Sequence, residues 1–263
     1  MFSETHAHLY RYTFPSVELD ETIRQAEENG VNIILNAGVD LETSIKAVKI
    51  AQKYSSVYAC VGVHPWFANS FDDMIYEMLL DLTKEKKVVG ISEIGLDFVG
   101  RREAVWAQER AGTGNYLPKT IQIKTFTEQL KLAKKVNLPV ILHHNNSHRE
   151  VLETLRHERG SEIEGVIHGF FGDLETAKKY LDLGFYISIG KRSILGERIV
   201  PKDLSSLINV IKEIPVEKLL IETDSGTPAE VKDVAKKIAE FKGISFEKVG
   251  KITTSNIKNL LGI

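Results

Sequence analysis

Two histidines near the N-terminus, His6 and His8, have the spacing of a metal-ligand pair. If they lie on a β-strand, side chains two residues apart point to the same face, and the two imidazoles follow each other at about 6.6 Å along the backbone. Histidine nitrogen is a common ligand of zinc and of other transition metals. Such a pair also arises by chance in a surface or a core, so a metal site requires further ligands from the rest of the fold.

Further carboxylates and histidines stand within or at the ends of short apolar segments. Glu93 lies inside the run GISEIGL, and Asp224 ends LLIETD two residues after Glu222. A carboxylate buried in an apolar strand is costly without a compensating cation, which a metal ion supplies. A mixed set of imidazole and carboxylate suits zinc, manganese, cobalt, nickel or iron better than calcium. Six of the eight histidines also stand at or near such ends (His6, His8, His64, His143, His144 and His168), and only His148 and His157 lie elsewhere.

The elements that would carry these residues alternate regularly along the chain. The strand-like segments are short and almost continuously apolar, which suits parallel strands covered on their outer face. Eight such segments separated by helical patterns are the count of a (β/α)8 barrel, and about 250 residues is the usual size of that fold. The strands are predicted near Phe2, Val31, Val57, Val88, Val140, Val166, Tyr186 and Leu220, and the helices over 15–29, 40–54, 71–86, 121–136, 149–157, 174–183, 204–214, 229–241 and Phe246–Leu261.

We therefore predict an α/β fold, a TIM (β/α)8 barrel that forms a single domain over residues 1–263 and is closed by the last two helices. A doubly wound open sheet is the alternative, but that fold often carries a glycine-rich phosphate turn after its first strand, where this chain has His6-Ala7-His8. In a barrel the C-terminal ends of the strands share one mouth, where the polar residues would meet. The segments 147–150 (SHRE) and 227–230 (TPAE) have the form of capping boxes at helix starts.

Six short motifs follow one another along the chain: THAHL, VGVHPW, SEIGLDF, LPVILH, GVIHGFFG and LLIETDS. In this order, and over nearly the whole chain, they resemble the TatD family of metal-dependent hydrolases, within the wider amidohydrolase-like barrels. The resemblance implies two divalent metal ions per chain (Zn, Mn or Mg), with Glu93 bridging them, and a metal-dependent deoxyribonuclease or phosphodiesterase activity. The metal ligands that it implies are His6, His8, Glu93, His143, His168 and Asp224.

Three of the predicted site residues, Asp224, Glu93 and His64, have candidate catalytic roles. Two cations a few ångströms apart can bind a phosphate oxygen, lower the pKa of a bridging water and stabilise the attacking and leaving oxygens. Asp224 would then orient or deprotonate the water. His64, in GVHPW, would contact the phosphate or the leaving oxygen without binding metal, or would instead hold a neighbouring group by a hydrogen bond.

The chain departs from the family pattern around the fifth strand. The family has an arginine in an HSRDA-like run there, and this chain has HHNNS over 143–147. Arg149 would replace that arginine, or it is a solvated helix residue. His144 should point away from His143 on a strand, so we exclude it from the ligands. Lys191 and Arg192, after the seventh strand, lie on the face of the barrel that would meet a phosphate, or form a solvated pair.

Two loops also differ from the family. The loop after the eighth strand is shortened to 225–228 (SGTP), which removes surface for gripping a nucleic acid. An extra stretch over 99–119 interleaves basic and aromatic residues, a composition that can follow a nucleic-acid backbone and stack bases, or that forms a lid or plain surface loop. Its basic and aromatic residues are Arg101, Arg102, Arg110, Lys119, Trp106 and Tyr116.

The composition of the chain bears on its substrate, its location and its association with a membrane. The formal net charge of -2 gives no overall attraction to nucleic acid, although bound cations remove that objection locally. A single cysteine, Cys60, cannot form an internal disulfide, and no apolar run approaches the roughly 20 residues that span a bilayer, so we expect a cytoplasmic protein with no membrane partner. A monomer is plausible.

Three functions remain open. The first is a phosphodiesterase that cleaves DNA, at single strands or ends. The second is an amidohydrolase or lactonase that acts on a small molecule, because the same metal site can attack a carbonyl. The third is a non-catalytic binding barrel in which the metal has a structural role.

Overall fold

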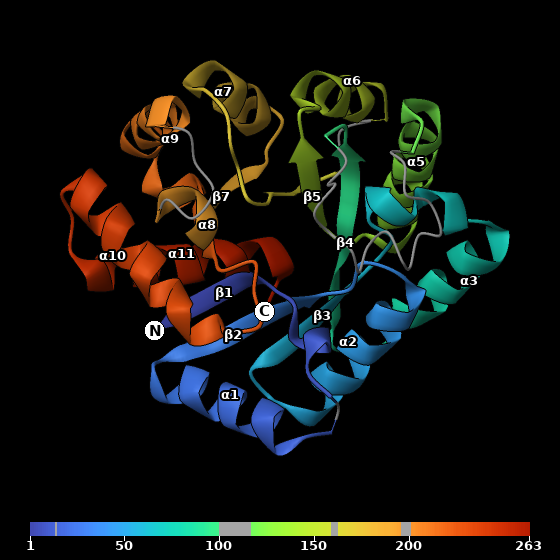
Figure 1. Cartoon of the computed structure of the whole chain (residues 1–263), viewed down its shortest axis with the longest axis horizontal. Coiled ribbons are helices and arrows are strands. Elements are labelled where there is room, and N and C mark those ends of the chain that lie inside the picture. The colour runs from blue at the N-terminus through green and yellow to red at the C-terminus, as the bar shows by residue number, and fades with distance from the viewer. Residues whose placement is uncertain (14, 100–116, 159–162, 196–200) are drawn as a thin grey trace.

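Eight parallel strands form the centre of the molecule. The computed structural model describes residues 1–13, 15–99, 117–158, 163–195 and 201–263. The strands pair in chain order from β1 to β8, with helices around the outside (Figure 1). The predicted TIM barrel is confirmed, and each of its eight strands lies where the sequence predicts one. They are β1 Phe2–Ala7, β2 Val31–Ala37, β3 Val57–Val61, β4 Val88–Asp97, β5 Val140–Asn145, β6 Gly165–Ile167, β7 Tyr186–Gly190 and β8 Leu219–Glu222.

The outer helices follow the strands in the expected alternation. Several begin at a side-chain cap, as where Asp40 accepts the N–H of Thr43 and Asp173 accepts that of Thr176. Their bounds are α1 Val17–Glu28, α2 Leu41–Lys53, α3 Asp73–Leu82, α5 Lys119–Val136, α6 His148–Glu158, α7 Leu174–Asp182, α8 Lys191–Ile194, α9 Pro201–Glu213, α10 Val231–Lys242 and α11 Phe246–Leu261.

Some local expectations were wrong. The helix predicted over 71–86 is shorter in the structure, where α3 ends at Leu82. A 3-10 segment, Pro65–Ser70, precedes it and begins with a proline directly after its cap residue, His64. The short helix α8 was not predicted. No described helix combines the length and the apolar character needed to cross a bilayer.

The side chains of the two predicted capping boxes make other bonds. Oγ of Ser147 accepts the N–H of Asn145 and donates to the carbonyl of Leu96, so it fastens the end of β5 to β4. Oγ1 of Thr227 donates to the carboxylate of Glu230 within a 3-10 turn, and α10 begins only after that turn.

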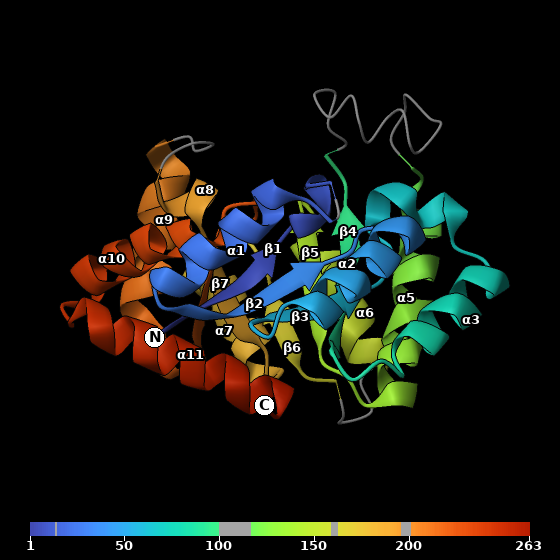
Figure 2. The same ribbon diagram turned by 90° about the horizontal axis from the view of Figure 1, so that it is seen from below.

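Helix α11 covers the end of the barrel that lies away from the strand C-termini. The ring of Phe2, at the start of β1, packs against Phe246 with 4.7 Å between ring centroids. A Cβ atom at Gly250 would lie 2.3 Å from the same Phe2 ring, so a glycine permits this close packing. Figure 2 shows α11 along one edge of the molecule, beside the N-terminus.

Strands β1 and β8 meet at a seam that backbone pairing alone does not close. Among the described residues the two strands share an isolated bridge, between Ala7 and Ser225 just beyond the end of β8. The buried carboxylate of Glu4 accepts the N–H of His6 at 2.9 Å and the N–H of Thr223 at 2.9 Å. A side chain therefore satisfies amide groups that a regular ladder would pair, directly below the mouth of the barrel.

Candidate metal centre

A cavity of about 340 Å³ opens at the C-terminal ends of the strands. Five of the six predicted metal ligands line it, and the sixth, His6, lies fully buried beside them. The barrel thus brings together residues from β1, β4, β5, β6 and the end of β8, as expected when parallel strands converge on one mouth. The lining includes His8, His64, Glu93, Asp97, His143, His168, Glu222 and Asp224.

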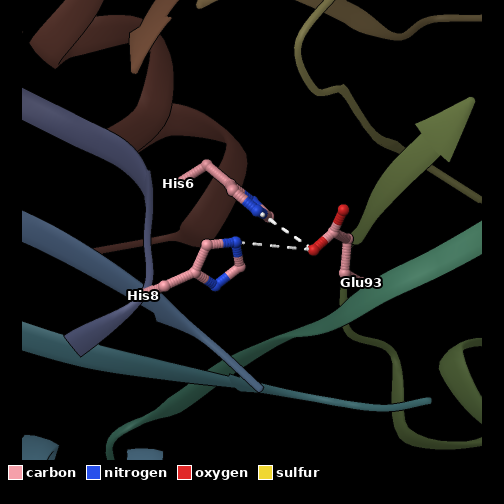
Figure 3. Close-up of side chains that lie close together, drawn as sticks. All are labelled: His6, His8 and Glu93. Carbon is pink, nitrogen blue, oxygen red and sulfur yellow. Dashed lines mark ion pairs between the residues drawn. The ribbon is translucent and has the colours of Figure 1, made fainter. Parts of the chain in front are cut away.

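The first group consists of His6, His8 and Glu93. Figure 3 shows both rings directed at one oxygen of the carboxylate. Nε2 of His6 lies 3.4 Å from Oε2 of Glu93, and Nε2 of His8 lies 3.7 Å from the same oxygen. Ligand atoms around one tetrahedral ion lie about 3.4 Å apart when each bond is about 2.0–2.2 Å. Both nitrogen–oxygen distances are close to that value, and the three ligand atoms lie within 4.8 Å of one another, so the group could hold one metal ion.

The hydrogen bonding of His6 tests whether a metal fits. The side chain is 0% exposed, and neither ring nitrogen has a hydrogen-bond partner among the described residues. A buried imidazole without partners is unfavourable, and a metal ion bound at Nε2 would provide the missing interaction. The first group therefore fits the divalent ion that the sequence predicts.

The second group consists of Glu93, His143 and His168. Oε1 of Glu93 lies 2.8 Å from Nδ1 of His143 and 3.0 Å from Nε2 of His168. The two carboxylate oxygens thus face different pairs of histidines: Oε2 faces the pair at the end of β1, and Oε1 faces the pair at the ends of β5 and β6. Glu93 would thus hold a divalent ion together with either pair of histidines, and would supply negative charge to both sides of the site.

Asp224 completes the β1 side of the site. Its backbone has a φ of 53°, in the left-handed region that aspartate tolerates better than most residues, and its N–H donates to the carbonyl of His6. Oδ1 then lies 3.0 Å from Nε2 of His8, and Oδ2 lies 3.4 Å from Nη1 of Arg192. Burial acts to raise the pKa of Asp224, but the hydrogen bond from His8 and the nearby imidazoles outweigh it and hold that pKa below its usual value. The carboxylate is therefore charged.

Two further carboxylates orient the histidines of the second group. Oε1 of Glu222 lies 3.0 Å from Nδ1 of His168, and Oδ2 of Asp97 lies 3.0 Å from Nε2 of His143. Burial acts to lower the pKa of His143, yet the bonds to Asp97 and Glu93 raise it to about 9. Both carboxylates stand where they can hold the ring nitrogen opposite the one that faces Glu93.

His64 has the geometry of a neutral hydrogen-bond donor. Its Nδ1 accepts the N–H of Trp66 at 3.1 Å, so the proton of the neutral ring is on Nε2, which lies 3.5 Å from Oε1 of Glu93. Burial, reinforced by the charge of His143, lowers the pKa of His64 to about 3. Nε2 thus presents an N–H group to the cavity, which fits a contact to substrate or to Glu93 rather than a bond to metal.

The remaining histidines of the sequence analysis lie apart from the ligands. His144 borders the cavity, but its ring stacks on His148 with 4.2 Å between ring centroids and packs against Phe170. His157 is exposed on α6. The expectation that His144 points away from the site agrees with this placement.

The basic residues proposed for phosphate contact have different positions. The guanidinium of Arg192 reaches Asp224 and lines the cavity, whereas the amino group of Lys191 pairs with Glu230. Arg149 is 78% exposed and pairs with Glu150 on its own helix. The basic and aromatic residues of the 99–119 stretch, Lys119 apart, fall within 100–116 and lie outside the described residues.

Sequence reasoning missed the roles of Glu4 and Asp97. Both follow the rule that identified Glu93, because each is a carboxylate within or ending an apolar strand. Glu4 also shares the period-two pattern of His6 and His8, so it was open to the same argument.

Comparison with known proteins identifies the family of this chain. The family model described as TatD related DNase matches residues 4–262. The protein named "Uncharacterized metal-dependent hydrolase YabD" of Bacillus subtilis is 34% identical, with all of both chains covered. The protein named "3'-5' ssDNA/RNA exonuclease TatD" of Escherichia coli is 30% identical, with 93% of each chain covered.

A solved structure gives the same result. The crystal structure of YjjV, a TatD homologue from Escherichia coli, is 27% identical to this chain and superposes with a TM-score of 0.82, covering 100% of this chain and 98% of that one. The chain therefore belongs to the TatD related DNase family and is a metal-dependent hydrolase.

Proposed function

We propose that this hydrolase cleaves phosphodiester bonds in nucleic acid, at single strands or strand ends, with two divalent metal ions as cofactors. The observation that carries the proposal is the position of Glu93, whose two oxygens face the two histidine pairs separately. A cavity of about 340 Å³ admits the end of one strand more easily than an intact duplex. The name of the Escherichia coli exonuclease supports a nucleic-acid substrate.

Three residues around the proposed metal pair have different catalytic roles. Such a pair, when bound, supplies positive charge that polarises a phosphate and makes a water molecule more acidic. Asp224 orients the attacking water and accepts its proton, for which its charged state is required. His64 donates its Nε2 hydrogen to a phosphate oxygen or to the leaving oxygen, and Glu93 holds the two halves of the site together.

A second candidate is an amidohydrolase or lactonase for a small molecule. It is favoured by the absence of arginine from residues 143–147 and by the exposure of Arg149, so neither supplies a phosphate-binding cation on the β5 side of the cavity. A neutral carbonyl substrate needs no such cation.

Metal analysis combined with a substrate screen tests both candidates. The purified protein, loaded in turn with zinc, manganese or magnesium, is assayed on single-stranded DNA, on a chromogenic phosphodiester and on neutral esters and lactones. We expect two ions per chain and preferential hydrolysis of the phosphodiesters. Preferential lactone or ester hydrolysis would support the second candidate.

A matched pair of variants tests catalysis itself. Asp224→Ala should abolish turnover, whereas His157→Ala, at an exposed position of α6, should retain it. If Asp224→Ala keeps both its metal and its turnover, the barrel does not use this site for catalysis.

A cytoplasmic location fits the single, buried and unpaired Cys60.

A further inference from the structure

The charged side chains that line the cavity are mainly acidic. Four carboxylates line it, those of Glu93, Asp97, Glu222 and Asp224. Within the described part of the chain, the lining contains two arginines, Arg11 and Arg192, and no lysine. An anionic substrate that approaches four carboxylates requires positive charge near its phosphate, and a cationic side chain would add to the charge that the proposed metal ions supply.

Arg192 lines the cavity and forms an ion pair with a predicted metal ligand, Asp224. It lies in α8, directly after the C-terminal end of β7, and its side chain is 29% exposed. Nη1 lies 3.4 Å from Oδ2 of Asp224, while Oδ1 of the same carboxylate lies 3.0 Å from His8. The guanidinium is therefore held beside a predicted metal ligand.

The contact between Arg192 and Asp224 leaves most of the guanidinium available. Its distance is at the long end for a hydrogen bond, and it uses one of the five N–H groups of the side chain. Among the described residues, Arg192 forms no other side-chain hydrogen bond or ion pair. A partly exposed single contact of this kind contributes little stability, so Asp224 can turn to a metal ion at small cost.

Neighbouring cations are not placed in this way. The amino group of Lys191 pairs with Glu230 at 3.1 Å. Arg149 is 78% exposed and its guanidinium pairs with Glu150 and Glu153 along α6. Each of these side chains has an acidic partner outside the cavity, whereas the partner of Arg192 belongs to the site.

We infer that Arg192 binds a non-bridging oxygen of the substrate phosphate and thereby makes the site select phosphodiesters over neutral esters. The inference rests on the proposed function and names the residue that gives it specificity. A guanidinium matches the paired oxygens of a phosphate and stays protonated at every working pH. A neutral lactone or ester carries no net charge and gains much less from the same contact.

Kinetics of the metal-loaded enzyme measure this selectivity. Arg192→Ala should raise KM for a chromogenic phosphodiester, bis(p-nitrophenyl) phosphate, by about ten- to a hundredfold, the range expected for loss of one charged hydrogen bond. Its effect on hydrolysis of neutral p-nitrophenyl acetate should stay within twofold. Arg192→Lys should recover part of the loss, and Arg149→Ala, which removes an exposed arginine, should match the unsubstituted enzyme on both substrates.

Binding of inorganic phosphate provides a readout that does not depend on turnover. Calorimetric titration of metal-loaded protein should show at least tenfold weaker phosphate binding for Arg192→Ala, with unchanged metal content. Unchanged phosphate affinity, no phosphate binding by the unsubstituted protein, or loss of metal from Arg192→Ala would each overturn the inference. An enzyme that binds phosphate through Arg192 yet hydrolyses no phosphodiester would overturn the proposed function and the selectivity derived from it, and would leave standing only the binding of phosphate by Arg192.

Discussion

Oδ2 of Asp97 lies 3.0 Å from Nε2 of His143 and also accepts the indole N–H of Trp66 at 3.0 Å. When Nδ1 of His143 binds an ion, Nε2 must carry the ring proton, and Asp97 is placed to accept that hydrogen bond. The carboxylate of Asp97 is almost fully buried, so water does not compete for its hydrogen bond with His143. Asp97 and Trp66 together therefore orient one ring of the second metal group.

Replacing Asp97 should weaken metal binding without removing a ligand. Asp97→Ala leaves Nε2 of His143 without its acceptor, and we expect metal affinity to fall by about 10- to 100-fold. Calorimetric titration of the metal-free protein with zinc or manganese measures the change. Asp81→Ala, which removes an exposed carboxylate on α3, serves as the control. Equal affinities of the two variants would show that Asp97 does not orient the ligand.

Glu4 should stabilise the seam between β1 and β8. Glu4→Ala leaves the buried N–H groups of His6 and Thr223 without an acceptor, and we expect the free energy of unfolding to fall by about 2–5 kcal/mol. Glu4→Gln keeps a carbonyl oxygen for these groups and should lose less. Urea denaturation of the metal-free proteins gives both values. A Glu4→Ala variant as stable as the unsubstituted chain would contradict this role.

His148 should make the protein less stable in mild acid. Burial lowers the pKa of His148, while its bond to the carbonyl of Phe171 only partly opposes that effect. Because the unfolded chain then binds the proton more readily, stability is lost as the pH falls below about 6.5, by at most about 1.4 kcal/mol per pH unit for one group. Urea denaturation at several pH values should show a shallower dependence for His148→Gln. His157→Gln, on the exposed face of the same helix, should leave the dependence unchanged.

Cys60 should report on unfolding. The thiol is 0% exposed, and burial raises its pKa to about 12, so the reactive thiolate is scarce at neutral pH. We expect no reaction of the folded protein with a thiol reagent such as dithiobis(nitrobenzoate) at pH 8, and one equivalent of reaction in concentrated urea. Rapid labelling without denaturant would show that the barrel opens around β3.

The sequence was sufficient to predict the barrel because its signals are local. Each strand is a short apolar run between helical patterns, and Glu93 stands out because a charge inside such a run needs a partner. The six metal ligands were predicted from the resemblance to the TatD family, and the convergence of strand ends in a barrel explains why residues so far apart in the chain lie together. Residues whose partners lie far away in the chain were harder to interpret, since nothing near Glu4 indicates a bond to Thr223.

The orientation of the His143 ring and the hydrogen bonds of Ser147 also could not be predicted from the sequence. The ring of His143 is oriented by Asp97, which is itself held by the indole of Trp66. These three residues lie on different segments of the chain and meet only in the folded barrel. Ser147 matches a capping pattern, but the neighbouring strand offers the carbonyl of Leu96, and the hydroxyl bonds there. Tertiary contacts decided both outcomes.

The seam between β1 and β8 also determines at which stage of folding the predicted metal ligands come together. His8 and Asp224 are 216 residues apart in the chain, so their contact forms only after the first and eighth strands have been brought together. Closing so long a loop is slow compared with forming neighbouring strand and helix pairs. A chain still emerging from the ribosome therefore carries the histidines of β1 without Asp224. Coordination by all six predicted ligands would therefore mark a chain whose synthesis has passed Asp224 and whose barrel has closed, and chains truncated before Asp224 would lack it.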